Sequence, residues 1–303
     1  MTDATDSPAL RSGMVGIFGR PNVGKSTLMN RVLGQKIAIT SPKPQTTRHR
    51  ILGIHTTDDM QAVFVDTPGL HLNAKRAMNR YLNRAASNVM AEVDVAVFVT
   101  DALRWTDEDE DVLKRLTNFH GPVVLVVNKI DTVKDKEALL PHLKALGERR
   151  DFATVVPLSA RKGSNIDAFE TALRELLPHT DRFYPEDQIT DRSERFLAAE
   201  IVREKLIMAL DQELPYAITV EIESFKRDEA GKIEIHALIW VERDGQKRIV
   251  IGKGGAVLKD VGRKARLELR DMLETPVHLQ LWVKVKSGWA DNERALQGLG
   301  YDS

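Results

Sequence analysis

The chain has 303 residues, of which 42% are hydrophobic and 29% are charged, and its 44 basic side chains balance 44 acidic ones. This length is enough for about two domains, since a domain usually has roughly 100–200 residues. The chain contains no cysteine, which excludes disulfides, thiolate metal sites and cysteine nucleophiles. The polar N-terminal extension at 1–10 lacks the features of a signal peptide, and no apolar run approaches the ~18 residues of a spanning helix. We therefore expect a soluble protein.

Short valine-rich runs alternate with helical stretches in the first part of the chain. They lie at residues 14–18, 62–65, 93–99, 123–127 and 155–158, and a further strand is expected at an edge at 50–55. Continuous apolarity is typical of strands that are buried on both faces, as in a mostly parallel sheet covered by helices. The pattern predicts a doubly wound α/β domain over 11–178, with its ligand at the carboxyl ends of the strands.

The alternation stops near residue 178. Residues 179–192 are polar, contain proline and lack a period, which is typical of a linker. The remaining residues, 193–303, predict a smaller α+β domain. Its expected elements are a helix at 193–210 capped by Asp191 or Ser193, strands at 217–225 and 232–242, a short helical segment at 247–251, a helix at 256–273 and a strand at 277–285.

A glycine-rich loop follows the first expected strand and precedes a helix. Its residues are Gly19, Arg20, Pro21, Asn22, Val23, Gly24, Lys25, Ser26 and Thr27. Glycines let such a loop turn its N–H groups toward phosphate oxygens at the positive end of the following helix. Lys25 would reach the β- and γ-phosphates, and the Ser26 hydroxyl would bind Mg²⁺. A glycine turn that binds nothing is the weaker alternative, because the whole pattern stands between a strand and a helix.

Three further motifs follow, each at the end of an apolar run. They are Asp66, Thr67, Pro68 and Gly69, then Asn128, Lys129, Ile130 and Asp131, and finally Ser159 and Ala160. Asp66 suits a contact to Mg²⁺ through water, and the Gly69 N–H suits the γ-phosphate. Asp131 can accept hydrogen bonds from N1–H and the 2-amino group of guanine, both of which adenine lacks.

The other residues of these motifs would complete the base site. Asn128 can bridge to the base and tie its loop together, and the stem of Lys129 can cover the purine ring. The backbone of Ser159 and Ala160 can donate to guanine O6. The four motifs in this order predict a guanine-nucleotide site.

Residues 37–50 form a long polar connection where a switch loop is expected. One threonine there would complete the Mg²⁺ shell and sense the γ-phosphate; we favour Thr47, and Thr46 remains open. Ras-like GTPases have a water-orienting glutamine directly after the third motif, whereas this chain has Leu70, so we expect slow intrinsic hydrolysis. Asn22 can hold a monovalent cation such as K⁺.

A second glycine-rich loop lies in the C-terminal part, between two expected helices. It consists of Gly252, Lys253, Gly254 and Gly255, and the cations nearby include Lys247, Arg248, Lys259 and Arg263. A Gly-x-x-Gly loop of this kind is similar to that of KH domains, which clamps about four nucleotides of single-stranded nucleic acid. On the pattern alone, a solvated turn beside a charged helix is an equally good interpretation.

Taken together, the two parts resemble the Era-like family of bacterial GTPases that carry a C-terminal type II KH domain. The resemblance covers nearly the whole chain and is strongest at 43–48, 189–193, 213–216, 276–279 and 282–290. It implies a GTPase that uses Mg²⁺, binds the 3′ end of 16S rRNA and assists maturation of the 30S ribosomal subunit. It also implies a monomer in the cytoplasm with peripheral contact to the inner membrane.

Other classes of GTP-binding protein compete with this interpretation. The C-terminal part could instead dock a protein or a membrane, as in GTPases of tRNA modification or membrane traffic. A tandem-GTPase ribosome factor would need a second motif set, which the sequence lacks. A module that binds GTP without hydrolysing it stays open because of Leu70.

Overall fold

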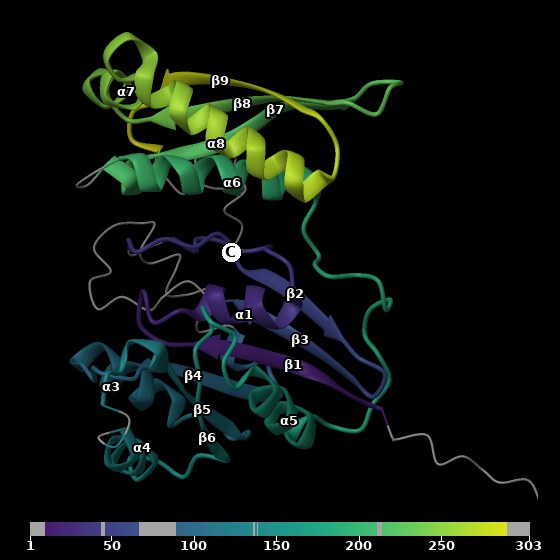
Figure 1. The fold of residues 1–303 in the computed structure, drawn as a ribbon, viewed down its shortest axis with the longest axis vertical. Helices are drawn as coiled ribbons and strands as arrows, with labels where there is room; N and C mark the ends of the chain where they lie inside the picture. The colour runs from purple at the N-terminus through teal and green to yellow at the C-terminus, as the bar shows by residue number, and fades with distance from the viewer. Residues whose placement is uncertain are drawn as a thin grey trace, which may run out of the picture. The chain divides into compact units, whose positions relative to one another are not determined.

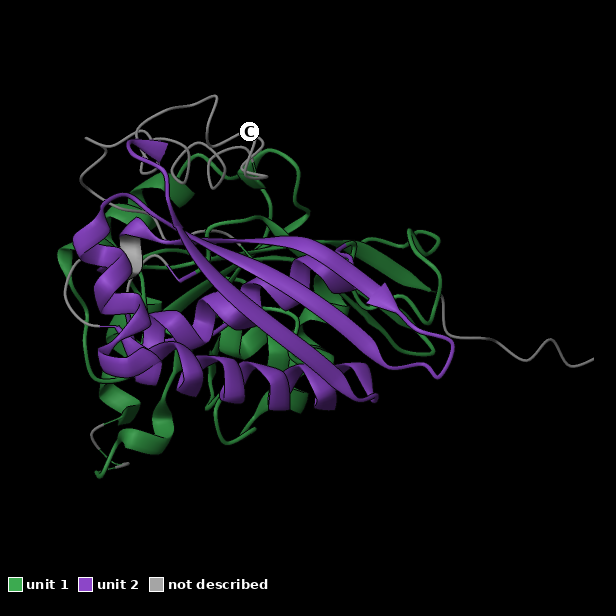
Figure 2. Cartoon of the chain, turned by 90° about the horizontal axis from the view of Figure 1, so that it is seen from above, with its two compact units in different colours: residues 1–38, 47–73, 82–191 green, residues 39–46, 74–81, 192–303 purple. Residues whose placement is uncertain are grey.

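The structure is a computed structural model that describes residues 10–43, 46–66, 89–135, 137, 139–210 and 214–289. The chain divides into two compact units (Figure 2). The first takes in ranges 1–38, 47–73 and 82–191, and the second takes in ranges 39–46, 74–81 and 192–303. In the described part of the chain, no helix is both long enough and apolar enough to cross a membrane.

The first unit is built on a six-stranded sheet. In order across the sheet, the strands are β2 (Ile51–Thr56), β3 (Met60–Asp66), β1 (Arg11–Phe18), β4 (Val95–Asp101), β5 (Val123–Asn128) and β6 (Thr154–Pro157). Only β2, at one edge, is antiparallel to its neighbour, and the described pairs of the other strands are parallel. The predicted mostly parallel sheet with an added edge strand is therefore confirmed.

Helices cover both faces of this sheet (Figure 1). They are α1 (Lys25–Leu33), α3 (Asp107–Leu116), α4 (Leu139–Gly147) and α5 (Ile166–Leu176), and a short 3₁₀ helix η1 spans Ile130–Thr132. Side chains of β3 alternate between the faces: Val63 and Val65 join the core that includes Leu116 of α3 and Leu146 of α4. Phe64 points the other way and stacks on Phe169 of α5, with ring centroids 6.4 Å apart.

Strand β4 begins two residues later than the predicted run at 93–99. The Asp94 carboxylate accepts a hydrogen bond from the Met14 N–H at 2.7 Å, so Asp94 precedes the ladder instead of entering it. Strand β1 lies between β3 and β4. The chain therefore adds β2 and β3 on one side of β1 and then β4, β5 and β6 on the other side, so the strand order reverses at β1. In open α/β sheets this reversal leaves a crevice at the carboxyl ends of the strands, where the loop after β1 begins.

The polar segment at 179–192, predicted as a linker, is attached to the first unit over much of its length. Thr190 pairs with Gly53 of β2, and the Ile54 N–H donates to Ile189 O at 2.7 Å. The buried Gln61 side chain accepts from the N–H groups of residues 183 and 184 at 2.8 and 3.0 Å and donates to Tyr184 O at 2.9 Å. One buried carboxamide thus fixes the middle of the segment.

The second unit is a three-stranded sheet covered by helices. Its strands are β7 (Thr219–Arg227), β8 (Ile233–Val241) and β9 (Val277–Val285), and its helices are α6 (Glu194–Ala209), η2 (Leu214–Ala217), α7 (Asp244–Ile251), η3 (Lys253–Gly255) and α8 (Ala256–Leu273). The central β8 is antiparallel to β7 and parallel to β9. Helices α6 and α8 pack on one face of the sheet (Figure 1). The α+β order agrees with the prediction.

Local signals explain the helix starts in this unit. Ser193 caps α6, since its Oγ accepts from the Phe196 N–H at 3.2 Å, and Ser193 rather than Asp191 therefore makes this bond. Helix α7 begins three residues earlier than the segment predicted at 247–251. The Gln246 side chain accepts from the Arg243 N–H at 3.1 Å and so completes an N-terminal cap that the sequence pattern did not reveal.

Replacing Gln61 by Leu tests the attachment of the linker. The change removes four part-buried hydrogen bonds, three of them to the segment and one to Thr56 Oγ1, while keeping the volume similar, and we expect a loss of roughly 1–3 kcal/mol in the free energy of unfolding. Chemical denaturation would measure the loss, and limited proteolysis should show faster cleavage near residue 183. Gln188→Leu is the control, because among the described residues the Gln188 side chain bonds within the segment, to Thr190 O at 3.2 Å. Equal stability of both variants would contradict the proposed anchor.

Candidate functional site

The loop after β1 has a backbone that only small residues tolerate. Gly24 has φ +103°, and a Cβ built on it would lie 2.3 Å from Asn128 Nδ2. Gly19 has φ +151°, and its Cβ would lie 2.5 Å from Val99 O. The backbone of Asn22 also lies in the left-handed region, at φ 64°. The glycines therefore let the loop approach β4 and β5 closely while it leads into α1.

Lys25 opens helix α1 and turns back into the loop. Its side chain is 6% exposed, and Nζ donates to Gly19 O at 2.9 Å and to Arg20 O at 3.0 Å. Burial lowers the pKa of the Lys25 ammonium from 10.5 to about 8, although the Asp66 carboxylate opposes the shift. Among the described residues, the hydrogen bonds of this ammonium go to neutral carbonyls, and a buried cation held in this way is poised for an anion such as a phosphate.

Three oxygen-bearing side chains meet beside Lys25. Ser26 Oγ lies 2.6 Å from Asp66 Oδ2 and 3.0 Å from Thr47 Oγ1, and Thr47 Oγ1 lies 3.3 Å from the same carboxylate oxygen. Asp66 is fully buried, and burial raises its pKa against the hydrogen bond from Ser26. Among the described residues, its second oxygen Oδ1 has no hydrogen-bond partner. Hydroxyl and carboxylate oxygens in this arrangement fit a hard cation such as Mg²⁺.

The two candidate threonines of the switch segment differ in direction. Thr47 is the one whose hydroxyl reaches Ser26 and Asp66. Thr46 Oγ1 instead bonds within its own segment, at 2.7 Å from Lys43 O and 2.6 Å from Ser41 Oγ. The geometry therefore favours Thr47 as the metal ligand.

Asn128, at the end of β5, ties three loops together. Its Nδ2 donates to Val23 O at 2.8 Å, and its Oδ1 accepts from the N–H groups of Lys129 at 2.7 Å and Ala160 at 3.0 Å. The phosphate loop, the 128–131 loop and the loop after β6 thus share one buried carboxamide. Sequence reasoning foresaw a tie within one loop, and the structure extends it to three.

The carboxylate of Asp131 is held by two partners. Ser159 Oγ donates to its Oδ1 at 2.7 Å, and Arg161, which is 72% exposed, donates to Oδ2 at 2.7 Å. The hydrogen bond from Ser159, followed by that from Arg161, keeps the pKa of Asp131 below its usual value. The carboxylate is therefore ionised and ready to accept hydrogen bonds from a base.

Three residues near the site escaped the sequence motifs. Asp101 ends β4 and pairs with Lys129 Nζ at 2.8 Å, and the buried Asp109 accepts from Arg20 Nε at 2.9 Å. Arg161 is the third. Asp101 follows an apolar run, which is the same signal that marked Asp66, so it was open to prediction. Neither Asp109 nor Arg161 follows such a run.

The remaining predicted residues of this site divide into two groups. Val23 is buried, Thr27 lies in the first turn of α1, Pro21 lies in the loop, and Ile130 opens η1. Thr67, Pro68, Gly69 and Leu70 lie outside the described residues.

The loop at 252–255 leaves its glycines in two different environments. Gly252, Gly254 and Gly255 have φ +75°, +60° and +79°. A Cβ on Gly252 would meet Val257 Cγ2 at 2.5 Å, whereas a Cβ on Gly254 or Gly255 would meet nothing within 4 Å. The first glycine thus packs against α8, and the next two face open space where a backbone or phosphate can approach.

Cations surround this loop. Arg263 is engaged by Asp260 at 3.2 Å, and Lys264 also pairs with Asp260, at 2.6 Å. Within the described ranges, four other cations form no ion pair: Lys247, Arg248, Lys253 and Lys259. The N-terminus of α8, which begins directly after Gly255, adds its partial positive charge. The loop therefore offers positive potential that the described part of the chain does not neutralise.

These features define a two-part protein: a P-loop GTPase domain joined to a KH domain. The family model described as "50S ribosome-binding GTPase" matches residues 14–129, and the model described as "KH domain" matches residues 213–290. The KH match takes in the loop at 252–255.

Relatives that match over nearly the full length of the chain identify its family. A GTPase Era from Ectopseudomonas mendocina is 57% identical and covers 98% of this chain and 99% of its own length. A GTPase Era from Cronobacter sakazakii is 56% identical over 95% of this chain and 96% of its own length. The chain belongs to the Era family of GTPases, which hydrolyse GTP.

Two solved structures match the whole fold. One is an Aquifex aeolicus Era variant bound to GDP·AlF4⁻, with a TM-score of 0.92 and 38% identity, covering 97% of this chain and all of that one. The other is Era in complex with MgGDPNP and nucleotides 1506–1542 of 16S ribosomal RNA, with a TM-score of 0.91, 38% identity and the same coverage.

Gly24→Ala should weaken nucleotide binding. The added methyl group would collide with Asn128 Nδ2 at 2.3 Å in a backbone at φ +103°, and strain of ~1–3 kcal/mol corresponds to a loss of GDP affinity of roughly 5- to 150-fold. Gly34→Ala is the matched control, because it has φ +66° and nothing within 4 Å of its Cβ. Calorimetric titration with GDP would compare the two variants; similar affinities would contradict the clash.

The lowered pKa of Lys25 predicts opposite pH trends for stability and nucleotide binding. Between about pH 8 and pH 10.5 the unfolded chain holds a proton that the folded chain lacks, so the contribution of Lys25 to stability rises with pH in this window. Binding a phosphate requires the ammonium, so GDP affinity of the free protein should fall as pH rises through about 8. Lys25→Arg should bind more weakly but lose this pH dependence, because a guanidinium stays charged. Titrations across the window would reveal a flat profile for the wild type if the inference is wrong.

Proposed function

We propose that this chain is a GTP-hydrolysing switch that binds the 3′ end of 16S ribosomal RNA through its KH unit and assists assembly of the 30S subunit. The observation that carries the proposal is the Era–MgGDPNP–rRNA complex, whose protein matches 97% of this chain. A second support, independent of that likeness, is the open space at Gly254 and Gly255 beside cations for which the described residues offer no ion-pair partner.

In the nucleotide site, each proposed role follows from the contacts. Lys25 and the loop N–H groups would hold the phosphates, and Ser26 and Thr47 would bind Mg²⁺ directly while Asp66 acts through water. Mg²⁺ would neutralise charge on the phosphates during hydrolysis. Asp131, which is ionised and held by Ser159 and the exposed Arg161, would select guanine.

Several finer roles rest on residue type and family resemblance. Asn22 would hold K⁺, and Gly69 would sense the γ-phosphate. Leu70 has no group that can orient water, so intrinsic hydrolysis would be slow. The protein would act as a cytoplasmic monomer with peripheral contact to the inner membrane, and its GTPase domain would span 11–178, its linker 179–192 and its KH domain 193–303.

The switch itself would depend on the γ-phosphate. With GTP bound, Thr47 and Gly69 would be ordered around the metal and phosphate; hydrolysis would release them. RNA affinity would then differ between the two nucleotide states by population shift.

The double substitution of Gly254 and Gly255 by Asp tests RNA binding without disturbing the fold. Each new side chain enters open space, and Asp tolerates positive φ better than most residues. We expect at least a tenfold loss of affinity for a single-stranded RNA matching the 3′ end of 16S rRNA, with GTP hydrolysis in the absence of RNA preserved. Fluorescence anisotropy at fixed salt, with GDPNP and with GDP, would measure it.

Gly231→Asp is the matched control for this experiment. Gly231 lies in the turn between β7 and β8, has φ +81° and would place its Cβ with nothing within 4 Å, so the change adds one negative charge, half of that in the double variant, and similar strain per residue elsewhere in the unit. Binding by this control with loss in the double variant would support the clamp. If the wild type binds no RNA in either state, the C-terminal unit is a docking domain for a protein or a membrane instead.

A further inference from the structure

Asp109 is a buried carboxylate beside the phosphate loop. It lies in the first turn of α3, and its side chain is 0% exposed. Its Oδ2 accepts from the N–H and the Oγ1 of Thr106 and from Arg20 Nε, each at 2.9 Å. Among the described residues, its Oδ1 has no hydrogen-bond partner. Burying a carboxylate is costly unless it is paired, so the guanidinium of Arg20 is the partner that offsets this cost.

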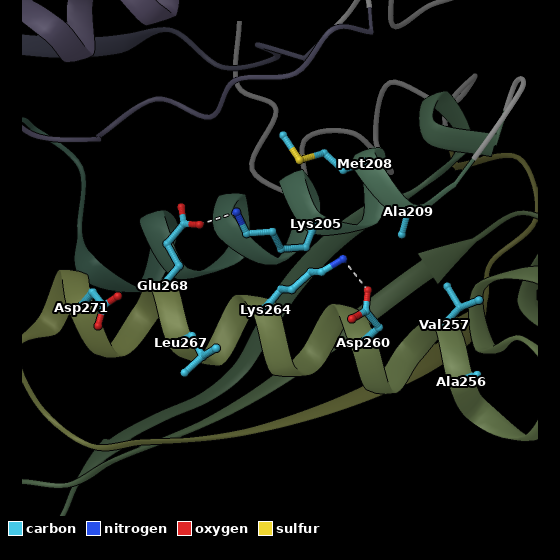
Figure 3. A pocket seen from close by; sticks show the side chains of 10 residues that line it. All are labelled: Lys205, Met208, Ala209, Ala256, Val257, Asp260, Lys264, Leu267, Glu268 and Asp271. Atoms are coloured by element: carbon cyan, nitrogen blue, oxygen red, sulfur yellow. Dashed lines mark ion pairs between the residues drawn. The ribbon is translucent and has the colours of Figure 1, made fainter. Parts of the chain in front are cut away.

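The groove between α6 and α8 in the second unit shows a charged pair of a different kind. Lys264 and Asp260 point toward each other there (Figure 3), and their side chains are 54% and 41% exposed. Exposed pairs one helical turn apart contribute little to stability. Arg20 and Asp109 are instead 89 residues apart in the chain, and their side chains are 12% and 0% exposed. This buried pair therefore fixes one loop to one helix.

The backbone on either side of Arg20 explains why the loop needs such an anchor. Gly19, directly before it, has φ +151°, and a glycine places few limits on the path of the chain. Pro21, directly after it, only biases Arg20 toward an extended backbone. The position of the first residues of the loop must then be set by a side chain, and the side chain that is held is that of Arg20.

The same residue also receives the lysine of the loop. Lys25 Nζ donates to Arg20 O at 3.0 Å and to Gly19 O at 2.9 Å. The carbonyl that holds the ammonium thus belongs to the residue whose guanidinium is held by Asp109. A shift of Arg20 would move this carbonyl, and with it the place of the ammonium.

A second anchor holds the loop further along. Asn128 Nδ2 donates to Val23 O at 2.8 Å, three residues after Arg20. The loop is therefore held at its start from α3 and near its end from β5. Both anchors lie in the first unit.

We propose that Asp109 and Arg20 are positioning residues for the phosphate loop: the buried carboxylate holds the guanidinium and so fixes the start of the loop in the shape that receives the phosphates. The inference rests on the proposed function, because it assigns the support of that same nucleotide site. A loop that is held in its binding shape before the ligand arrives loses less conformational freedom on binding, which raises affinity.

A double-mutant cycle in the full chain tests this role. Asp109→Asn removes the charge but keeps the size and an oxygen that can accept from Thr106, and Arg20→Met removes the guanidinium. We expect each single variant to lose GDP affinity by at least about tenfold. The double variant should lose no more than the weaker-binding single variant, because both changes break one interaction. Calorimetric titration in excess Mg²⁺ would measure the affinities, and circular dichroism would establish each fold.

Asp111→Asn is the matched control. Asp111 lies on the same helix and pairs with Arg115 at 3.0 Å, and the side chains of this pair are 30% and 34% exposed. The change removes the same charge from α3 but leaves the partner of Arg20 in place. We expect the GDP affinity of Asp111→Asn to match that of the wild type.

A second readout separates positioning from a general loss of structure. Inosine diphosphate lacks the 2-amino group that Asp131 would recognise, so the ratio of GDP affinity to inosine diphosphate affinity reports on the base end of the site. We expect this ratio to stay at the wild-type value in both single variants, because Asp109 acts on the phosphate end.

Arg20→Lys keeps the test valid if Asp109→Asn does not fold. Lysine keeps a positive charge near Asp109 but lacks the planar Nε–H group that makes the bond. We expect Arg20→Lys to bind GDP more weakly than the wild type and more tightly than Arg20→Met.

The outcomes separate the positioning role from the proposed function. Wild-type GDP affinity in folded Arg20→Met, additive losses in the cycle, or an equal loss in Asp111→Asn overturns the positioning role while the nucleotide site stands. A changed ratio of GDP to inosine diphosphate affinity in the single variants also overturns it, because the damage then extends beyond the phosphate loop. If the wild type binds no GDP, the proposed nucleotide site fails, and the positioning role fails with it.

Discussion

The carboxamide of Asn128 holds the nucleotide site together, and the geometry of its loops depends on it. It joins the carbonyl of Val23 to the N–H groups of Lys129 and Ala160, which come from three separate loops. Because Asn128 ends β5, an inner strand of the first unit's sheet, its carboxamide anchors the three loops to the strands. Phosphate binding and base selection therefore share one support, and the close approach of Gly24 to the carboxamide is the condition for it.

The two glycine-rich loops use glycine for different physical reasons. A Cβ on Gly24 would lie 2.3 Å from Asn128 Nδ2, and a Cβ on Gly252 would lie 2.5 Å from Val257 Cγ2, so at these two positions glycine permits close packing. Gly254 and Gly255 have open space around them and serve access. A sequence pattern cannot separate close packing from open access, because in both cases it shows a glycine in a loop before a helix.

Most of the fold and the nucleotide loops could be predicted from the sequence because they depend on local signals. Apolar runs marked the parallel strands, and the motifs at their ends marked the site; Asp101 obeyed the same rule and could have been included. The charged face of α6 could not be predicted. In the sequence, Glu200, Arg203 and Glu204 look like a solvated helix surface, and only the three-dimensional path of a segment about 150 residues earlier shows that they are buried.

The split of the chain between its units has a consequence for synthesis on the ribosome. Residues 39–46 emerge more than 160 residues before the end of α6, yet the partners of their backbone are Arg203 and Glu204. At roughly 5–20 residues per second, the interval is on the order of ten to thirty seconds. The sheet of the first unit can form during that time, whereas this one loop must wait for the arrival of a helix encoded far downstream. In a newly made chain, the phosphate loop can therefore form before the partners of residues 39–46 on α6 have been synthesised.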